Sequence, residues 1–492
     1  MSSIKKFWAY MWPVRREEMP VFLSITGMMF CILFIQNLIR ALKDSIINAL
    51  IGTEIISFLK FWGVMPTAFF VAFCYMKAVN IFDSRKIFYT ILASFLSFFI
   101  FFAFVIFPNH EALHLNADQM HSLIAAHPHW KWFILIGAKW GFSLFYIISE
   151  LWPSVVVSLL FWQFVNQITS VEQSSRFYPL FGLFGQTGLV LSGAFLSKLP
   201  DVSRLLAGPN AICLNEMAVK VVISFVVVLV LLGMSCFWFL NNKTSVKEKE
   251  IEFKVKKQKI TLKESVSMIL SSRYIRLIAI IMICYGAAIN IAESPLKAEA
   301  AKHYNNVADF ASFAGRYLSY TGILTLILVL INSSVVRKFG WFCAAVITPI
   351  VLTSTGMLFF AAMNFPDVKM GLVNLFLVQD PLMIVIYCGI LQTTLSKSTK
   401  YTFFDITKEM AYVPLSDELK TKGKAAVELI ATKIGKSASS LMQSIVFIAI
   451  PSASYSSISM YLMYVFGIVC IVWLWAVREL SVSYKEITTK PT

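Results

Sequence analysis

Long apolar runs alternate along this chain with short polar segments, and twelve of the runs have the length of a membrane-spanning helix. Such a helix needs about 20 mainly apolar residues to cross a bilayer. The run Trp132–Phe164 is too long for one upright span, so it predicts either a tilted helix kinked at Pro153 or two short helices. The pattern therefore allows twelve or thirteen spans. The twelve runs are Val21–Ile39, Phe58–Met76, Ile87–Phe107, Trp132–Phe164, Tyr178–Leu196, Val219–Leu240, Ile275–Ile291, Phe310–Val336, Trp341–Met363, Gly371–Leu395, Ala425–Ile450 and Ile458–Val477.

The composition excludes an ordinary soluble protein. Hydrophobic residues make up 58% of the 492 residues and charged residues 14%, and the mean hydropathy is +0.72. Soluble domains are about one-quarter charged and could not bury this much apolar surface. The eight cysteines form no CxxC pair, which favours buried free thiols over a disulfide framework or a zinc site. The predicted fold class is an all-α polytopic membrane protein.

Basic residues are concentrated on one side of the predicted membrane. With twelve spans, both termini and the segment Asn241–Arg276 share a side with roughly 29 Lys and Arg, against about 7 opposite. The positive-inside rule makes that side cytoplasmic, whereas a thirteenth span would split the basic loops between the two sides. The net charge of +16 is then carried by loops that face lipid headgroups, and no nucleic-acid partner is expected.

The spans fall into two sets of six, which matches the plan of major-facilitator transporters. Such proteins bind substrate between their halves near the bilayer midplane and alternate access by rocking one half against the other. No clear residue-level repeat relates the two sets. The predicted division is an N-terminal cytoplasmic segment (1–20), a six-helix half (21–240), a basic cytoplasmic linker (241–274), a second six-helix half (275–477) and a cytoplasmic tail (478–492).

Seven charged residues interrupt the apolar spans, and cations outnumber anions among them. A charge at the bilayer centre costs about 2.5–3.5 kcal/mol even on the more lenient insertion scale, so it needs a partner or a use. This pattern predicts a positively biased, water-filled cavity for an anionic solute, as in a transporter. The seven are Arg40, Lys43, Lys139, Glu150, Glu293, Lys433 and Lys436.

The charges share helical faces with other polar residues, including Tyr146 in the fourth span and Asn290 in the seventh. Cations beside such groups suit a polyphosphate, although a sugar phosphate or dicarboxylate would suit them too. The alternative is a structural role in salt bridges between helices, such as Lys43 with Glu150 or Lys436 with Glu293. Both roles are compatible in a transporter that breaks ion pairs as it switches.

Three other motifs carry weaker signals. The sequence IGKS at Ile434–Ser437 resembles the end of a phosphate-binding loop, but Ile430 stands where the first glycine belongs, so no ATPase is predicted. Five histidines in His110–His129 match no zinc spacing; a solvated loop is expected, with metal binding or pH sensing as alternatives. Asp380, before Pro381, predicts a kink inside the tenth span or a buried proton or counter-ion site.

Four segments together closely resemble the bacterial and plastid ATP/ADP translocase family, and the resemblance extends over nearly the whole chain. They contain the elements LKD, ELW, FWQFxNxIT and GKS. The segments are LIRALKDSIINALIGTEIISFLK (Leu38–Lys60), SELWPSVVVSLLFWQFVNQIT (Ser149–Thr169), RFYPLFGLFG (Arg176–Gly185) and KGKAAVELIATKIGKSASSLMQ (Lys422–Gln443).

The resemblance implies exchange of external ATP for internal ADP, as in obligate intracellular bacteria that take energy from a host. It also implies four residues important for transport: Lys43 in ALKDS, Glu150 in SELW, Glu293 in IAESPLK and Lys436 in IGKS. The chain departs from the family pattern at ESPLK, where the family usually has EGVWK, and at Pro153, where it has glycine.

We therefore expect a secondary-active nucleotide transporter in a bacterial inner membrane, with both termini cytoplasmic, a monomeric functional unit, and no cofactor or metal. Arg40, Lys43 and Lys436 are predicted to bind the phosphates, with Glu150 and Glu293 as transport carboxylates. The alternatives are net or proton-coupled import of other nucleotides such as GTP, CTP or UTP, and, more distantly, a membrane-embedded transferase or a channel. Additional candidate site residues are Lys139, Tyr146, Asn290, Asp380 and Lys433.

Overall fold

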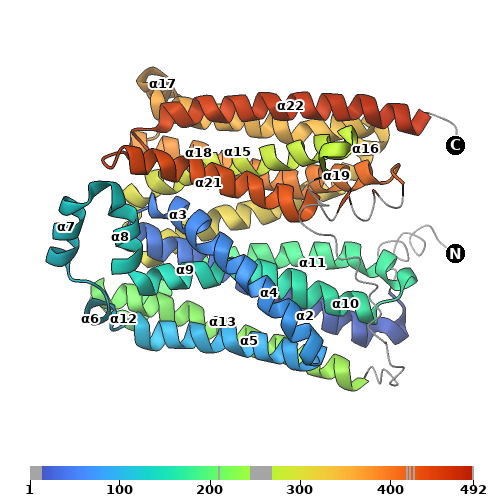
Figure 1. Cartoon of the computed structure of the whole chain (residues 1–492), viewed down its shortest axis with the longest axis horizontal. Coiled ribbons are helices and arrows are strands. Elements are labelled where there is room, and N and C mark those ends of the chain that lie inside the picture. Colours follow the sequence, from blue (N-terminus) through green and yellow to red (C-terminus); the bar gives the residue numbers. More distant parts are fainter. Residues whose placement is uncertain are drawn as a thin grey trace.

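The computed structural model describes residues 14–208, 211–243, 267, 269–416, 419, 423–424 and 427–489. The first part of the predicted N-terminal segment, most of the predicted linker (241–274) and the last three residues of the tail lie outside the described residues. Every regular element that the structure describes is a helix. In Figure 1 the helices of the N-terminal part lie in the lower half of the view, and those of the C-terminal part lie above them.

The N-terminal part begins with the first long helix, α2, and ends with α13. Five short stretches are 3₁₀ or π turns and carry the label η. The elements are η1 (Arg16–Glu18), α2 (Met19–Leu50), α3 (Ile55–Phe58), η2 (Leu59–Val64), α4 (Met65–Ile81), α5 (Ser84–Phe101), η3 (Phe102–Ile106), α6 (His110–Leu113), α7 (Ala117–Ala126), η4 (Pro128–Trp130), α8 (Lys131–Ala138), α9 (Trp140–Trp152), η5 (Pro153–Phe161), α10 (Trp162–Ile168), α11 (Val171–Ser197), α12 (Leu199–Ala207) and α13 (Ala211–Lys243).

The C-terminal part begins with α15 and ends with α22. Its longest element, α16, contains two spans that turn at Gly340, where φ is +79°, a backbone conformation that favours glycine. The elements are α15 (Arg273–His303), α16 (Val307–Asn364), α17 (Pro366–Phe376), α18 (Pro381–Thr399), η6 (Lys400–Phe404), α19 (Asp405–Tyr412), η8 (Val427–Ala431), α21 (Thr432–Ala449) and α22 (Ser459–Thr489).

The described helices account for the predicted membrane crossings. Ten are long and apolar enough to cross a membrane, and α17 together with Pro381–Tyr412, a pair bent by 88° at a short break, is an eleventh candidate. The remaining predicted span, Ala425–Ile450, corresponds to η8 and α21, which pack against α15. Large apolar side chains such as Phe70, Leu330 and Ile471 are exposed, as suits helices surrounded by lipid.

Two predicted spans differ from the structure. The run Trp132–Phe164 is broken at Lys139, so that α8 is separate and the span runs from α9 through η5 to α10. The predicted span Gly371–Leu395 has other bounds: α17 ends at Phe376, and the chain bends by 88° before α18, where Asp380 accepts a hydrogen bond from the Leu382 backbone N–H at 2.8 Å. The predicted kink at Asp380 and Pro381 is therefore confirmed. Asp followed by Pro is a strong helix start, and the helical segment that begins there continues past Leu395 to Tyr412.

The start of α2 and the end of α22 lie at the same end of the bundle, on the right of Figure 1. We call this the terminal end. The opposite end, which carries α6, α7 and α8, we call the distal end. The chain reverses direction between consecutive spans, so the direction of each helix is known. This direction decides which residues of the site lie nearer each end.

Candidate functional site

The centre of the bundle holds an ion-pair network that begins on α2. The Lys43 ammonium lies 2.8 Å from the Asp44 carboxylate and 2.9 Å from that of Glu150 on α9. It also lies 3.9 Å from the centre of the Tyr146 ring. Lys43 is only 3% exposed, so these neighbours enclose it. The predicted pair of Lys43 with Glu150 is therefore confirmed.

The same network joins the two halves of the protein. Lys297 of α15 lies 2.9 Å from Asp44 of α2, and 3.4 Å from Glu293 on its own helix. Arg40 of α2 lies 3.7 Å from Glu293. Carboxylates of each half thus neutralise cations of the other, which is the arrangement that buried charges require.

Glu293 has a third cationic neighbour, but it is not the predicted one. Lys397 of α18 lies 3.3 Å from Glu293, and its ammonium is 5.2 Å from the Tyr317 ring centre. Lys436 of α21 forms no ion pair with any carboxylate in the described part of the chain, so the predicted pair of Lys436 with Glu293 is wrong for this state. Lys436 is instead exposed, within electrostatic range of Arg40, Glu150, Glu293 and Lys400.

A second polar chain crosses between the halves beside this network. The Lys60 ammonium donates a hydrogen bond to the Asn290 side-chain oxygen at 2.5 Å. The Asn290 amide nitrogen in turn donates to the hydroxyls of Ser439 at 2.9 Å and Ser440 at 3.0 Å. This chain connects η2 of the N-terminal half to α15 and α21 of the C-terminal half.

The exposed charges of the site all lie on its terminal side. Side-chain exposure is 36% for Arg40 and 34% for Glu150, against 3% for Lys43. Lys400, paired with Asp405 at 2.8 Å, is 24% exposed. The helix directions place each accessible residue about one turn nearer the terminal end than the enclosed residue of its own span. The pairs are Arg40 and Lys43, Glu150 and Tyr146, Lys400 and Lys397, and Lys436 and Ser439. The more accessible part of the site therefore faces the terminal end.

Contacts between the halves close the distal end. The Tyr455 backbone N–H donates to Glu54 at 3.3 Å, and His129 bonds the Ile448 carbonyl at 2.7 Å. The small residues Gly193 and Gly315 bring α11 and α16 into backbone contact, since a Cβ at either would lie under 3.0 Å from the other helix. Further hydrogen bonds between α11 and α16 extend from the Ser312–Ser197 contact near the distal end to the Ser319–Val190 contact at the level of the central network.

Three candidate residues lie outside the network. Lys139 sits at the break between α8 and α9, at the distal end. Lys433 is exposed, with its ammonium 5.7 Å from the Phe69 ring centre. Asp380 is exposed at the start of α18, so the predicted buried carboxylate is wrong.

Sequence reasoning did not select five charged residues that the structure brings to the site: Asp44, Lys60, Lys297, Lys397 and Lys400. A signal existed for two of them, because Asp44 follows Lys43 and Lys297 stands four residues after Glu293. The lysines of α18 and η6 were missed because the tenth span was predicted to end at Leu395.

The glycines of two motifs serve helix packing. A Cβ at Gly435, in the IGKS motif, would collide with the Ile283 backbone of α15, and Gly286 meets α21 from the other side. Gly185, the last residue of the RFYPLFGLFG segment, lies against Leu33 of α2. The IGKS motif is therefore helical and close-packed, and it positions Lys436 rather than forming a phosphate loop.

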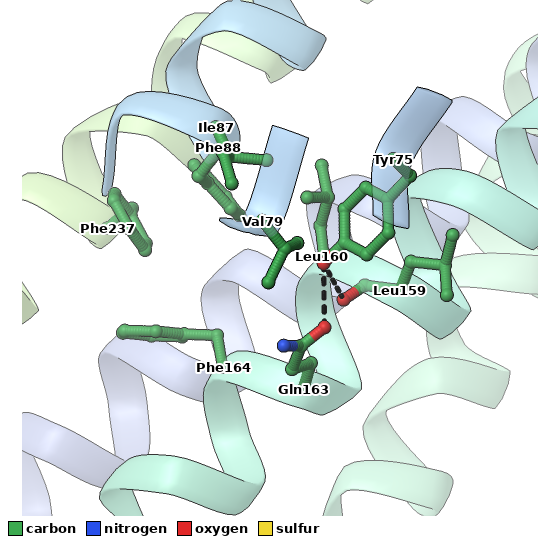
Figure 2. Close-up of a pocket in the computed structure, with 9 residues that line it drawn as sticks. All are labelled: Tyr75, Val79, Ile87, Phe88, Leu159, Leu160, Gln163, Phe164 and Phe237. Atoms are coloured by element: carbon green, nitrogen blue, oxygen red, sulfur yellow. Dashed lines mark hydrogen bonds between the residues drawn. The ribbon is translucent and has the colours of Figure 1, made fainter. Parts of the chain in front are cut away.

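A cavity within the N-terminal half has a different character. Figure 2 shows it between α4, α5, α10 and α13, where the Tyr75 hydroxyl donates to the Gln163 side chain at 2.6 Å. None of its lining residues is charged, so it lacks the groups that an anionic substrate needs. Among the described residues, no three His, Cys, Asp or Glu side chains are grouped as a metal site.

Comparison with known proteins gives a consistent result. The model of the family described as TLC ATP/ADP transporter matches residues 1–484. The chain is 54% identical to ADP,ATP carrier protein 4 of Rickettsia bellii over 98% of this chain and 94% of the relative. It is 40% identical to ADP,ATP carrier protein 3 of the same organism over 97% of each chain.

Solved structures with little sequence similarity share the fold. A bacterial homologue of the iron transporter ferroportin, in an inward-facing state, aligns with a TM-score of 0.58 at 12% identity, covering 95% of this chain and 99% of that one. The inward-open xylose transporter XylE from E. coli aligns with a TM-score of 0.55 at 12% identity, covering 94% and 95%. The predicted major-facilitator-like fold is thereby confirmed.

Proposed function

The chain belongs to the TLC ATP/ADP transporter family, and from that membership we propose that it exchanges ATP for ADP by alternating access. It is a multi-pass membrane transporter and not an enzyme. The Rickettsia relatives that are named ADP,ATP carriers cover nearly its whole length. A nucleotide is thus the substrate class, with ATP and ADP as the exchanged pair.

One observation carries the assignment of the site. Cations from both halves, Arg40 on α2 and Lys436 on α21, lie on the water-accessible side of a central ion-pair network. Lysine and arginine bind phosphate oxygens through charge-assisted hydrogen bonds, and arginine can do so with two at once. We infer that these two residues, with Lys400, receive the phosphates first.

Lys43 has another role in this proposal than the sequence suggested. Asp44, Glu150 and Tyr146 enclose it, so it does not face the accessible side in this state. We infer that phosphates entering beside Arg40 compete for the cations that Glu150 and Glu293 hold. Because the pairs between α2 and α15 join the halves, their exchange for substrate contacts biases the rocking equilibrium.

The cellular setting follows from charge distribution. We propose a bacterial inner membrane with the basic terminal end in the cytoplasm, so that the described state opens inward. We propose a monomeric functional unit, since the residues of both halves that form the described ion-pair network belong to one chain. Because the chain differs from the family pattern at ESPLK and at Pro153, the nucleotide base that it prefers is measured directly in the experiment below.

Exchange in proteoliposomes tests the proposal. Labelled ATP uptake is measured into vesicles loaded with ADP, loaded with GDP, CDP or UDP, or left empty, each with and without an uncoupler. We expect uptake that needs internal ADP and resists the uncoupler. Lys436→Gln should reduce ATP uptake at least about tenfold, because losing a hydrogen bond to a charged group costs about that factor in binding. The exposed control Lys433→Gln should leave the uptake unchanged. Uptake equal in empty and loaded vesicles would refute exchange.

A further inference from the structure

Lys60 differs from the other cations of the network in its partner. Its ammonium is partly buried and donates to the neutral Asn290 side chain at 2.5 Å. No carboxylate in the described part of the chain lies at ion-pair distance from it. A buried or half-buried lysine normally has such a partner, because an unpaired charge loses solvation without compensation.

Four neighbouring cations show the usual arrangement. Lys43 and Lys297 share Asp44, and each also meets a glutamate. Arg40 and Lys397 both lie near Glu293, at 3.7 Å and 3.3 Å. Lys60 thus resembles Lys436, which has no carboxylate partner among the residues that the structure describes, and these two lysines come from opposite halves of the protein.

Asn290 is held in a fixed orientation for this contact. Its amide nitrogen donates to the Ser439 and Ser440 hydroxyls, so its oxygen must face Lys60. Both serines lie on α21, within one turn or so of Lys436. A neutral amide binds an ammonium more weakly than a carboxylate does, so Lys60 can leave Asn290 for an anion at lower cost.

The formal charges of the network, counted together with Lys60 and Lys436 beside it, do not balance. Six cations face three carboxylates, leaving an excess of three positive charges, and the Lys400–Asp405 pair adds none. A fully ionised nucleoside diphosphate carries about three negative charges, so bound substrate would neutralise the excess. The cations are Arg40, Lys43, Lys60, Lys297, Lys397 and Lys436, and the carboxylates are Asp44, Glu150 and Glu293.

We propose that Lys60 is a further substrate-binding residue whose unpaired charge, with that of Lys436, prevents the empty carrier from closing and so enforces exchange. The proposal rests on the proposed function and deepens it. Closing the halves around an empty site would remove unpaired cations from water, at a high desolvation cost. With phosphates bound, the same cations are paired, so the loaded carrier closes and crosses.

The test compares exchange with net efflux in proteoliposomes. Full-length wild type, Lys60→Met, Lys60→Arg and the exposed control Lys433→Met are reconstituted with labelled ADP inside. Efflux is measured into medium with ATP, which reports exchange, and into nucleotide-free medium, where continued efflux requires the empty carrier to return. We expect Lys60→Met to raise the ratio of net efflux to exchange at least about tenfold, while Lys60→Arg and Lys433→Met keep the wild-type ratio.

An unchanged ratio in Lys60→Met would overturn the proposal. If Lys60→Met exchanges too slowly for the ratio to be measured, tripolyphosphate binding is measured instead, as the thermal stabilisation of the purified protein. Binding about tenfold weaker than that of the wild type supports the role of Lys60. Binding as tight as that of the wild type refutes this role. Failure of the proposed function is recognised separately, because then the wild-type protein itself would not exchange ATP for ADP.

Discussion

Asp44 is the residue on which the two halves depend most directly. It neutralises Lys43 of its own helix at 2.8 Å and Lys297 of α15 at 2.9 Å, and all three side chains are at most 7% exposed. Removing its charge would leave two buried cations short of a partner, which is far more costly than losing a surface pair.

We expect Asp44→Asn to abolish exchange and to lower the free energy of unfolding by about 3–5 kcal/mol. Thermal unfolding of the purified protein in detergent, together with ATP uptake by proteoliposomes, measures both effects. The matched control is Asp83→Asn, since Asp83 is 79% exposed beside Lys86. Equal stability of the two variants would contradict the role given to Asp44.

His114 shows that the histidine-rich distal loop is only partly the solvated segment predicted. Its Nε2 accepts a hydrogen bond from the Gly141 backbone N–H at 3.2 Å, and burial, with the nearby positive charge of Lys139, lowers its pKa to about 4. The neutral ring is thus the folded form, whereas the unfolded chain takes up a proton near its ordinary pKa of 6.5.

The contribution of His114 to stability is therefore complete above pH 6.5 and is lost as pH falls from 6.5 to about 4. We expect thermal stability to fall across this window, and His114→Gln, which keeps a neutral acceptor, to fall less steeply. Melting curves at several pH values provide the measurement, with the exposed His121→Gln as control. Parallel pH profiles for wild type and His114→Gln would argue against this role.

The helices of the site gain their shape from local departures from α-helical geometry. Lys60 lies in the π-helical η2 and Lys400 in η6, while η5 begins at Pro153, directly after the turn that carries Glu150. Proline cannot donate the backbone hydrogen bond that a regular helix needs there, so the wider turn follows. The apolar pattern predicts a span in each case, but it contains no information on such turns.

The contact between α15 and α21 depends on glycine. A methyl group at Gly435 would meet the Ile283 backbone at a distance that real side chains do not adopt. We expect Gly435→Ala to cost about 1–3 kcal/mol of stability and to reduce nucleotide exchange by displacing Lys436. Gly371→Ala on α17, where nothing lies within 4 Å, should be neutral or slightly stabilising. Unfolding curves and exchange rates of the two variants decide, and a harmless Gly435→Ala would refute the packing argument.

At the scale of the whole molecule, the structure is closed at its distal end and accessible at its terminal end. The closure includes the Ser312 hydroxyl of α16, which donates to the Ser197 carbonyl of α11 at 3.0 Å. In a transporter that alternates access, this contact has to separate once in each cycle.

A disulfide across this contact should stop transport reversibly. Under oxidising conditions we expect the double variant Ser197→Cys, Ser312→Cys to exchange nucleotide at least about tenfold more slowly than before oxidation. A reductant should restore the rate, because the disulfide holds the protein in one of its two states. Each single variant, oxidised in the same way, is the control. Full exchange by the oxidised double variant, with the bridge verified by mass spectrometry, would exclude rocking about this closure.

The sequence predicted the fold class and the central residues Lys43, Glu150 and Glu293, because a charge inside an apolar run is a strong signal. It did not predict that Lys43 is enclosed while Arg40 and Lys436 are accessible. That distinction depends on which end of the bundle is closed, a property of packing between helices far apart in the chain. Lys397 was missed because the tenth span was predicted to end at Leu395, two residues before it.

A structure of the protein with bound ATP tests the central claim most directly. We expect phosphate oxygens about 2.7–2.9 Å from nitrogen atoms of both Arg40 and Lys436, on the terminal side of the pair formed by Lys43 and Glu150. Phosphates bound elsewhere, or held by cations of one half alone, would contradict it.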